Sequence, residues 1–295
     1  ELNHTVQNHP FDTQTRQYTY SRANMVDILR LTKLVYSKAP QYDVIIGVDQ
    51  DGVIAALFVK LGFKAKKLVY LSLEIILKAD YGHKGPYFSM KHWLEKMALR
   101  CAHQLWIQDQ FRGRALVEDL GQPDFPLTIL PHAPRFIRQT QSKSGYLRKK
   151  YHLSDTVHIL VYTGGIDPVY QSIRLAEMAS RDEGWPEDAV LVMHGFGMAR
   201  HLHYLKTLQN TRFLLSTDLV LFSELEDLIA SADIGIALFD PSIDTNHRLM
   251  TSGKIMNYLK CGIPVIATGT ITTQDVIERH RAGVCIKDIQ ALPAA

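Results

Sequence analysis

The chain alternates short runs rich in Val, Ile and Leu with segments whose apolar residues recur at helical spacing, and it does so in two series. The first series runs from YDVIIGVD at 42–49 to PLTIL at 126–130, and the second runs from VHILVYTGG at 157–165 to VCIK at 284–287. Apolar strands that alternate with helices are typical of parallel sheets covered by helices on both faces. The pattern therefore predicts an α/β fold with two doubly wound sheets, which bind ligands at the carboxyl ends of their strands.

A polar and basic segment, RFIRQTQSKSGYLRKKYHLSD at 135–155, separates the two series. We interpret it as a connection that contains a short helix, and we place Rossmann-like domains at 1–140 and 156–295 with a linker at 141–155. A length of 295 residues fits two domains of ordinary size. Residues 1–20 are polar and aperiodic, so we expect a loop there.

The composition, 46% hydrophobic and 21% charged, is that of a globular protein. A net charge of +3 is too small to indicate a nucleic-acid partner. The sequence has no apolar run long enough to predict a transmembrane helix. The scattered Cys101, Cys261 and Cys285 lack metal-ligand spacing and favour a reducing, cytoplasmic location. The chain starts without Met and without an opening strand, and we expect it to be part of a protein that continues at both ends.

Two glycine motifs follow apolar strands in the second half. Gly164 and Gly165 stand where we expect a strand to end and a helix to begin, and His194, Gly195 and Gly197 form the motif HGFG after the next strand. Glycine allows the backbone to approach a phosphate, and a helix amino end supplies N–H donors with a partial positive charge. The alternative interpretation of each motif is a tight turn that binds nothing.

The segment from 232 to 268 carries the clearest binding pattern. We expect a strand to end at Asp240 and a helix to start near Thr251, Ser252 and Gly253, with Lys254 in its first turn. Hydroxyl groups, a glycine, a helix amino end and a lysine together match the needs of a diphosphate. The alternative is a helix that is merely capped by Ser252.

This segment resembles the carboxyl-terminal domain of retaining, family-4-type glycosyltransferases of the GT-B fold. The resemblance rests on Ala232-Asp233, Ser252-Gly253-Lys254, Tyr258 and the GIPVIA motif at 262–267. It covers about 156–288 well and 40–135 more loosely. It implies two Rossmann-like domains that face each other across a cleft. It also implies transfer of a sugar from a nucleoside-diphosphate sugar to a hydroxyl of a glycan or lipid-linked glycan, with retention.

The resemblance also implies roles for individual residues. Lys254 is the better candidate for binding and stabilising the leaving diphosphate, and Arg174 is the weaker one, with a solvated surface residue as its alternative. The base would lie near Phe222 and His194. A cationic clamp can replace a metal, and the sequence shows no Asp-x-Asp motif. We therefore predict transfer without a metal or other cofactor.

The chain departs from the family pattern at its pair of glutamates. The second glutamate, which holds the ribose in the family, is replaced by Asn257, whose amide can still bind hydroxyls. The first would fall near Leu249. Asp240, Asp244 and Asn246 are alternative substitutes, and the sequence does not choose among them.

The amino-terminal half is expected to bind the acceptor. A strand near 68–73 leads to Glu74, where a carboxylate would stabilise an oxocarbenium-like transition state or orient the acceptor hydroxyl. A glutamate on the surface of the next helix, without a catalytic role, is an equally good interpretation of Glu74. Asp80 and His83 follow in a glycine-containing loop and are further candidates for the same cleft.

Basic residues and aromatic residues suggest a second contact, with an anionic membrane or a lipid-linked acceptor. A solvated charged face is the simpler interpretation. The residues concerned are Lys60–Lys67, Arg112, Arg114 and Arg148–Lys150, with Tyr87, Phe88 and Trp93.

Two other functions compete with the transferase. A sugar-nucleotide-binding module without catalysis is favoured by Asn257 and the missing first glutamate. A GT-B-fold sugar-nucleotide 2-epimerase would need additional carboxylates and histidines that the sequence does not single out. A nicotinamide-dependent dehydrogenase is disfavoured, because no Gly-x-Gly-x-x-Gly motif opens a strand–helix unit with an acidic residue about twenty positions on.

Overall fold

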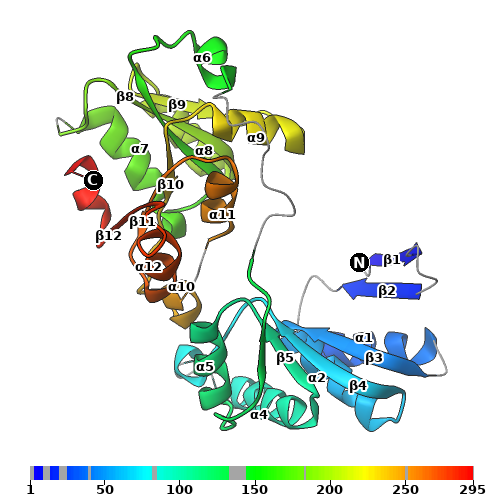
Figure 1. The fold of residues 1–295 in the computed structure, drawn as a ribbon. Coiled ribbons are helices and arrows are strands. Elements are labelled where there is room, and N and C mark those ends of the chain that lie inside the picture. The colour runs from blue at the N-terminus through cyan, green and yellow to red at the C-terminus, as the bar shows by residue number, and fades with distance from the viewer. Residues whose placement is uncertain are drawn as a thin grey trace. The chain divides into compact units, whose positions relative to one another are not determined.

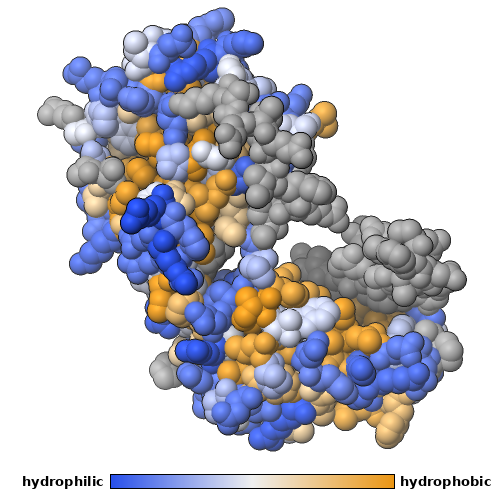
Figure 2. All heavy atoms as spheres, in the orientation of Figure 1, coloured by the Kyte–Doolittle hydropathy of each residue, from blue (hydrophilic) through white to orange (hydrophobic). Residues whose placement is uncertain are grey.

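A computed structural model describes residues 3–8, 14–19, 25–38, 41–81, 85–132, 144–182, 184–249 and 252–294. The chain divides into two compact units, Glu1–Pro131 and His132–Ala295. Each unit is built around its own parallel sheet with helices between successive strands (Figure 1). Apolar side chains appear among hydrophilic ones on the visible surface of both units (Figure 2).

The first unit contains a parallel sheet with the order β3-β4-β5-β6. Its central helix, α2, is apolar around most of its circumference and is therefore buried between the sheet and the neighbouring helices. The elements are α1 (Met25–Lys38), β3 (Tyr42–Val48), α2 (Asp49–Leu61), β4 (Ala65–Ser72), α3 (Lys78–Tyr81), α4 (Pro86–Cys101), β5 (Gln104–Ile107), α5 (Gln110–Asp119) and β6 (Leu127–Ile129).

The first residues form strands, which corrects the expectation of a loop at 1–20. β1 (Asn3–Asn8) and β2 (Gln14–Thr19) pair antiparallel as a separate two-stranded sheet, with Asn3 opposite Thr19. The sequence-based prediction failed here because these segments show no apolar face, whereas backbone hydrogen bonding between two strands does not require one.

The second unit contains a six-stranded parallel sheet with the order β12-β11-β10-β7-β8-β9. Strands β8 and β9 are added on one side of β7, and β10, β11 and β12 are then added on its other side. The topological switch point therefore lies between β7 and β10. The elements are α6 (Tyr146–Tyr151), β7 (His158–Ile166), the 3₁₀ helix η1 (Pro168–Tyr170), α7 (Ser172–Arg181), β8 (Ala189–Gly197), α8 (Ala199–Leu208), β9 (Phe213–Ser216), α9 (Phe222–Ala230), β10 (Ile234–Ala237), α10 (Thr245–Leu249), α11 (Gly253–Lys260), β11 (Val265–Thr268), α12 (Ile271–Ile277), β12 (Gly283–Ile286) and the 3₁₀ helix η2 (Ile289–Ala294).

Successive side chains of a strand point to opposite faces of the sheet, and each face is covered by helices and has its own hydrophobic core. Leu160 and Tyr162 of β7 pack with α7 and α8 on one face, while Ile159 and Val161 pack with α9, α11 and α12 on the other. Leu147 of α6 is fully buried in the second of these cores. The described part of the predicted linker, from residue 144, thus packs into the second unit.

Several predicted element ends are shifted. Gly164 and Gly165 lie inside β7, and η1 precedes the first turn of α7, so no helix amino end adjoins the two glycines. Helix α9 begins at Phe222, and the Glu224 carboxylate accepts a hydrogen bond from Leu221 N at 2.9 Å. β10 ends at Ala237, before Asp240.

Tyr258 of α11 bridges the switch point. β7 and β10 are in register over only two residue pairs, Ile234 with Leu160 and Gly235 with Val161. Beyond these pairs the Tyr258 hydroxyl accepts a hydrogen bond from Thr163 N at 2.9 Å and donates one to Ile236 O at 3.2 Å. A Cβ at Gly235 would fall 2.4 Å from the Tyr258 ring, so only glycine leaves room for it. One side chain thus satisfies the backbone groups that the diverging strands leave open.

We expect Tyr258→Phe to lower the free energy of unfolding by about 1–3 kcal/mol, because it leaves Thr163 N–H and Ile236 C=O buried without this partner. Urea denaturation monitored by circular dichroism measures the change. Tyr36→Phe is the control, since the Tyr36 hydroxyl bonds Gly62 O at 3.3 Å on the exposed surface. Equal stability of the two variants would contradict the bridging role.

Candidate functional site

The amino end of α11 lies at the switch point and is built as the sequence predicts. Ser252 caps the helix, and its Oγ accepts a hydrogen bond from Lys254 N at 3.3 Å. Lys254 and Tyr258 are one turn apart and both bond to β7, so the anchored tyrosine sets the position of the lysine. Thr251 lies outside the described residues.

The Lys254 ammonium group is held between two tyrosine rings. Its Nζ lies 4.2 Å from the ring centroid of Tyr162 and 4.3 Å from that of Tyr170, and it donates a hydrogen bond to the Tyr162 hydroxyl at 2.8 Å. Gly164, with a φ of 108°, passes beside the lysine, and a Cβ there would lie 3.1 Å from Lys254 Cε. Among the described residues no carboxylate forms an ion pair with Lys254.

This environment changes the ionisation of Lys254. Burial lowers the pKa of the amine to about 7. Contact with the faces of two rings favours the ammonium form and opposes this effect. Burial also raises the pKa of the Tyr162 hydroxyl well above its ordinary value, with neighbouring Tyr258 adding to the effect, so this tyrosine stays neutral. A lysine without a carboxylate partner is suited to bind an anion at this edge of the sheet.

The glycines of both motifs allow β7 and β8 to stay paired to their ends. Gly164 pairs with Gly195 and Ile166 with Gly197. A Cβ at Gly195 would fall 1.8 Å from Gly164 O, and one at Gly197 would fall 2.4 Å from Ile166 O. Close packing of the two strands therefore explains Gly195 and Gly197 without a ligand, whereas Gly164 also makes room for Lys254.

His194 belongs to a separate polar group. Its Nδ1 lies 2.9 Å from Ser216 Oγ, and Lys150 Nζ donates to the same hydroxyl at 3.4 Å and to Asp218. Burial lowers the pKa of His194, and the nearby Lys150 charge lowers it further. His194 is therefore neutral at neutral pH and interacts with β9 and α6 through its side chain.

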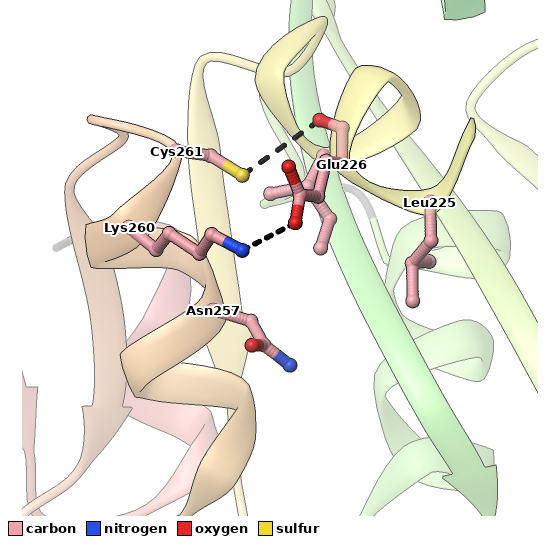
Figure 3. A pocket seen from close by; sticks show the side chains of 6 residues that line it. Leu225, Glu226, Asn257, Lys260 and Cys261 are labelled. Carbon is pink, nitrogen blue, oxygen red and sulfur yellow. Dashed lines mark hydrogen bonds and ion pairs between the residues drawn. The ribbon is translucent and has the colours of Figure 1, made fainter. Parts of the chain in front are cut away.

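The structure also locates two of the other predicted donor ligands. Arg174 lies against the side-chain amide of Gln290 in η2. Asn257 lines a small pocket between α9 and α11, where Lys260 forms an ion pair with Glu226 (Figure 3). The Phe222 side chain and His83 lie outside what the structure describes.

The three substitutes for the missing glutamate lie in and just before α10. Asp240 Oδ1 accepts hydrogen bonds from Ser242 N at 2.9 Å and Ser242 Oγ at 2.6 Å, which hold its pKa below the ordinary value. Burial raises the pKa of Asp244, but hydrogen bonds from His247 outweigh this effect and hold the pKa below its ordinary value. The Nδ1 atom of His247 lies 2.8 Å from Asp244 Oδ1. Both carboxylates are therefore ionised at neutral pH and bound to nearby groups of the same loop.

In the first unit, polar groups gather after β3, β4 and β5. Asp49 has a φ of 55°, and its Oδ1 accepts hydrogen bonds from Leu73 N at 2.7 Å and Glu74 N at 2.9 Å. Arg112 Nη2 donates to Leu73 O at 2.6 Å and lies 4.0 Å from Glu74 Oε2. The backbone at Glu74 is thus fixed, while its side chain is 61% exposed and accessible to a ligand.

A buried hydrogen-bonded group on β4 and the adjoining helices α2 and α4 was not singled out by the sequence. Glu95 accepts hydrogen bonds from the Tyr70 hydroxyl at 2.5 Å and from Gln50 Nε2 at 2.6 Å, and burial raises its pKa. A signal was present, because Glu95 lies at helical spacing from the buried Ala98 and Leu99. Polar residues on an apolar helix face are the ones to test for such networks.

The basic residues expected to meet a membrane are largely engaged within the chain. Arg112 is 2% exposed. Arg148 donates to Val157 O at 2.9 Å, and Lys66 pairs with Asp43 at 2.7 Å. Within the described ranges, no helix is long and apolar enough to span a membrane, and no three His, Cys, Asp or Glu side chains group as a metal site would require.

No family model and no curated protein matches this chain, whereas many solved structures do. HepE (Alr3699) of Anabaena in complex with UDP matches with a TM-score of 0.69 and 14% identity, over 90% of this chain and 70% of that one. An α,α-trehalose-phosphate synthase (UDP-forming) from Burkholderia xenovorans, in complex with glucose-6-phosphate, matches with a TM-score of 0.65 and 9% identity, over 100% of this chain and 80% of that one. A trehalose-6-phosphate synthase studied for glycosyl transfer with retention matches with a TM-score of 0.69 and 11% identity, over 94% of this chain and 70% of that one.

The chain has the GT-B fold. The likeness extends over both units and confirms the prediction of two Rossmann-like domains. It does not single out the family-4 group, since the matches include trehalose-phosphate synthases.

We expect Lys254→Met to raise the free energy of unfolding at pH 7 and below, and to leave it nearly unchanged above pH 10.5. A lysine whose pKa falls from 10.5 to about 7 on folding binds its proton more tightly in the unfolded chain. Wild-type stability therefore rises with pH between these values, while that of the variant lacks this rise. Urea denaturation at pH 6, 8 and 10 measures the difference, with the exposed Lys206→Met as control. A difference that does not change with pH would contradict the burial of Lys254.

We expect Arg112→Lys to lower the free energy of unfolding by about 1.5–3 kcal/mol, because a lysine cannot keep the planar contacts with Leu73 O and Gln108. Arg114→Lys, at an exposed position of the same helix, is the matched control and should change stability little. Chemical denaturation measures both. Similar losses in the two variants would contradict the role of Arg112 in fixing the segment after β4.

Proposed function

We propose that the protein is a glycosyltransferase that binds a nucleoside-diphosphate sugar at the amino end of α11 and moves the sugar to an acceptor hydroxyl. The observation that carries the proposal is Lys254, a cation without a carboxylate partner among the described residues, in the first turn of α11 at the switch point of the second sheet. Ligands of doubly wound sheets bind at such points, and helix amino ends favour anions. UDP is the first nucleotide to test, because HepE has been solved with UDP and with UDP-glucose.

The proposed reaction breaks the bond between the anomeric carbon and the diphosphate oxygen, and it forms a bond from the anomeric carbon to the acceptor oxygen. The acceptor hydroxyl loses its proton, and the nucleoside diphosphate leaves with an added negative charge. Lys254 and the first amide groups of α11 stabilise that charge. We propose retention of configuration without a metal, and the study of retention in a trehalose-6-phosphate synthase supports the former.

We propose that Glu74 acts on the acceptor side. Its backbone is fixed by Asp49, and its side chain is exposed beside the buried Arg112 guanidinium. A carboxylate so held can orient a hydroxyl or stabilise positive charge that develops on the sugar. A glycan is the proposed acceptor. A lipid-linked glycan is the second candidate, favoured by the exposed Trp93 and Met90 on α4, and a cytoplasmic location and peripheral membrane contact belong to the same proposal.

A sugar-nucleotide-binding module without catalysis is the second candidate function. Asn257 replaces the family's ribose-binding carboxylate and lines a pocket toward α9, while Asp240 and Asp244 are bound within their own loop. A 2-epimerase is a third possibility that no observation favours. Release of UDP from UDP-glucose supports catalysis, whereas binding without turnover, with or without added acceptors, supports the module.

We expect UDP and UDP-glucose to raise the melting temperature of the protein, because a ligand of the folded state stabilises it by mass action. Lys254→Ala should leave the fold intact and weaken UDP binding about 10–100-fold, as the loss of a charge-assisted hydrogen bond to phosphate does. Calorimetry measures the affinity, and Lys206→Ala is the surface control. Unchanged affinity in the Lys254 variant would remove this lysine from the site.

A further inference from the structure

We propose that Tyr162 and Tyr170 are positioning residues that hold Lys254 as an uncharged amine above neutral pH, and that binding of the donor diphosphate adds a proton to it. This inference rests on the proposed function and deepens it, because it makes donor affinity depend on proton uptake at one residue. The two rings and the Tyr162 hydroxyl form what we call the tyrosine cage.

The tyrosine cage is fixed from two elements other than α11. Tyr162 belongs to β7 and is fully buried, and its hydroxyl donates to Gly165 O. Tyr170 ends η1, whose first turn is capped by Asp167, with Oδ1 accepting from Val169 N at 3.0 Å. The ring of Tyr170 packs so close to Gly165 that a Cβ there would lie 3.2 Å from it. The cage is thus set by the backbone of β7 and η1 before a ligand arrives.

Among the described residues around the cage, no carboxylate pairs with an ammonium group at Lys254. Acidic groups on the surrounding elements are engaged elsewhere, and the ring of His132, whose Nε2 would lie 3.1 Å from a Cβ at Gly253, supplies no negative charge. Asp167 caps η1, Asp240 binds Ser242, Asp244 binds His247, Glu226 binds Lys260, and Tyr258 bonds to β7 and β10.

A charged Lys254 is therefore favoured by the rings and the Tyr162 hydroxyl alone, and these do not compensate for the water it has lost. Burial accordingly lowers the pKa of the amine to about 7. A diphosphate at the amino end of α11 would supply the missing negative charge and raise the pKa of Lys254 toward or above its ordinary value. Between these two pKa values the complex binds one proton more than the free protein.

The coupling predicts that the dissociation constant of the donor rises with pH above pH 7. Below pH 7 the lysine is already charged, so the affinity for donor does not depend on its titration. Above pH 7 each pH unit makes protonation tenfold less favourable in the free protein, so the dissociation constant rises up to tenfold per unit. The rise ends where Lys254 titrates in the complex.

Isothermal titration calorimetry with UDP-glucose at pH 6 and pH 8, each in two buffers of different ionisation enthalpy, measures the protons taken up. UDP-glucose is the suitable probe because it lacks the terminal phosphate monoester, whose own proton titrates near pH 6. We expect close to one proton per UDP-glucose at pH 8, little uptake at pH 6, and a dissociation constant that rises about tenfold from pH 8 to pH 9.

Three variants test whether the pH dependence of UDP-glucose binding arises from Lys254 in the tyrosine cage or from other groups of the protein. Lys254→Arg stays charged at all these pH values, so uptake at pH 8 should vanish and the affinity should become independent of pH. Lys260→Arg, two turns along the same helix and paired with Glu226, should keep the wild-type uptake. Tyr170→Leu opens one side of the cage to water and should move the titration of Lys254 upward, which reduces uptake at pH 8.

The ¹³Cε chemical shift of Lys254 in lysine-labelled protein gives the titration directly, with Lys254→Arg identifying the signal. A midpoint near pH 7 without ligand, moved above pH 9 by UDP-glucose, supports the proposal. A midpoint near pH 10 in the free protein, or binding of UDP-glucose without proton uptake at pH 8, overturns the coupling and leaves the proposed function standing. Absence of binding by UDP-glucose, UDP and other nucleotide sugars at both pH values overturns the proposed function and the coupling with it.

Discussion

The second unit depends on the way Tyr258 closes the gap between β7 and β10. Parallel strands that begin to diverge leave backbone donors and acceptors without partners, and buried groups of this kind are costly. The Tyr258 hydroxyl bonds to one such group on each strand, and Gly235 leaves room for its ring. The same contact fixes the rotation of α11 about its axis and places Lys254, one turn earlier, over the end of β7.

Lys254 lies at the switch point of the second sheet, where burial disfavours its charge. The cation lies where a doubly wound fold exposes helix amino groups and strand ends, which suits an anion. Burial at this position lowers its pKa, although the faces of the two rings favour the charged form. In the proposed function, the donor diphosphate supplies the negative charge that no described carboxylate provides to Lys254.

The two units solve different problems with similar sheets. In the first, the carboxyl ends of the strands are joined by hydrogen bonds through which Asp49 and the buried Arg112 bind the backbone around Glu74. In the second, the corresponding region contains glycines, aromatic rings and one lysine. A fixed but exposed carboxylate suits a neutral hydroxyl, and a lysine held between two rings suits a phosphate, as the proposed sugar transfer requires.

The sequence by itself determined the alternation of strands and helices, because buried parallel strands must be apolar throughout, and it determined the cap at Ser252 and the place of Lys254, because both depend on neighbours in the chain. It did not reveal the strands at 3–8 and 14–19, whose pairing needs no apolar face. Nor did it reveal Tyr162 and Tyr170 as neighbours of Lys254, the role of Tyr258 between β7 and β10, or the bonds of Arg112 to the segment after β4. Their roles arise from residues up to 95 positions away that the sheet order brings together. Only the tertiary structure could decide that Arg174 lies against Gln290, that Asn257 lines a pocket toward α9, and that Lys254 loses much of its water, since burial is a property of the packed sheet and helices.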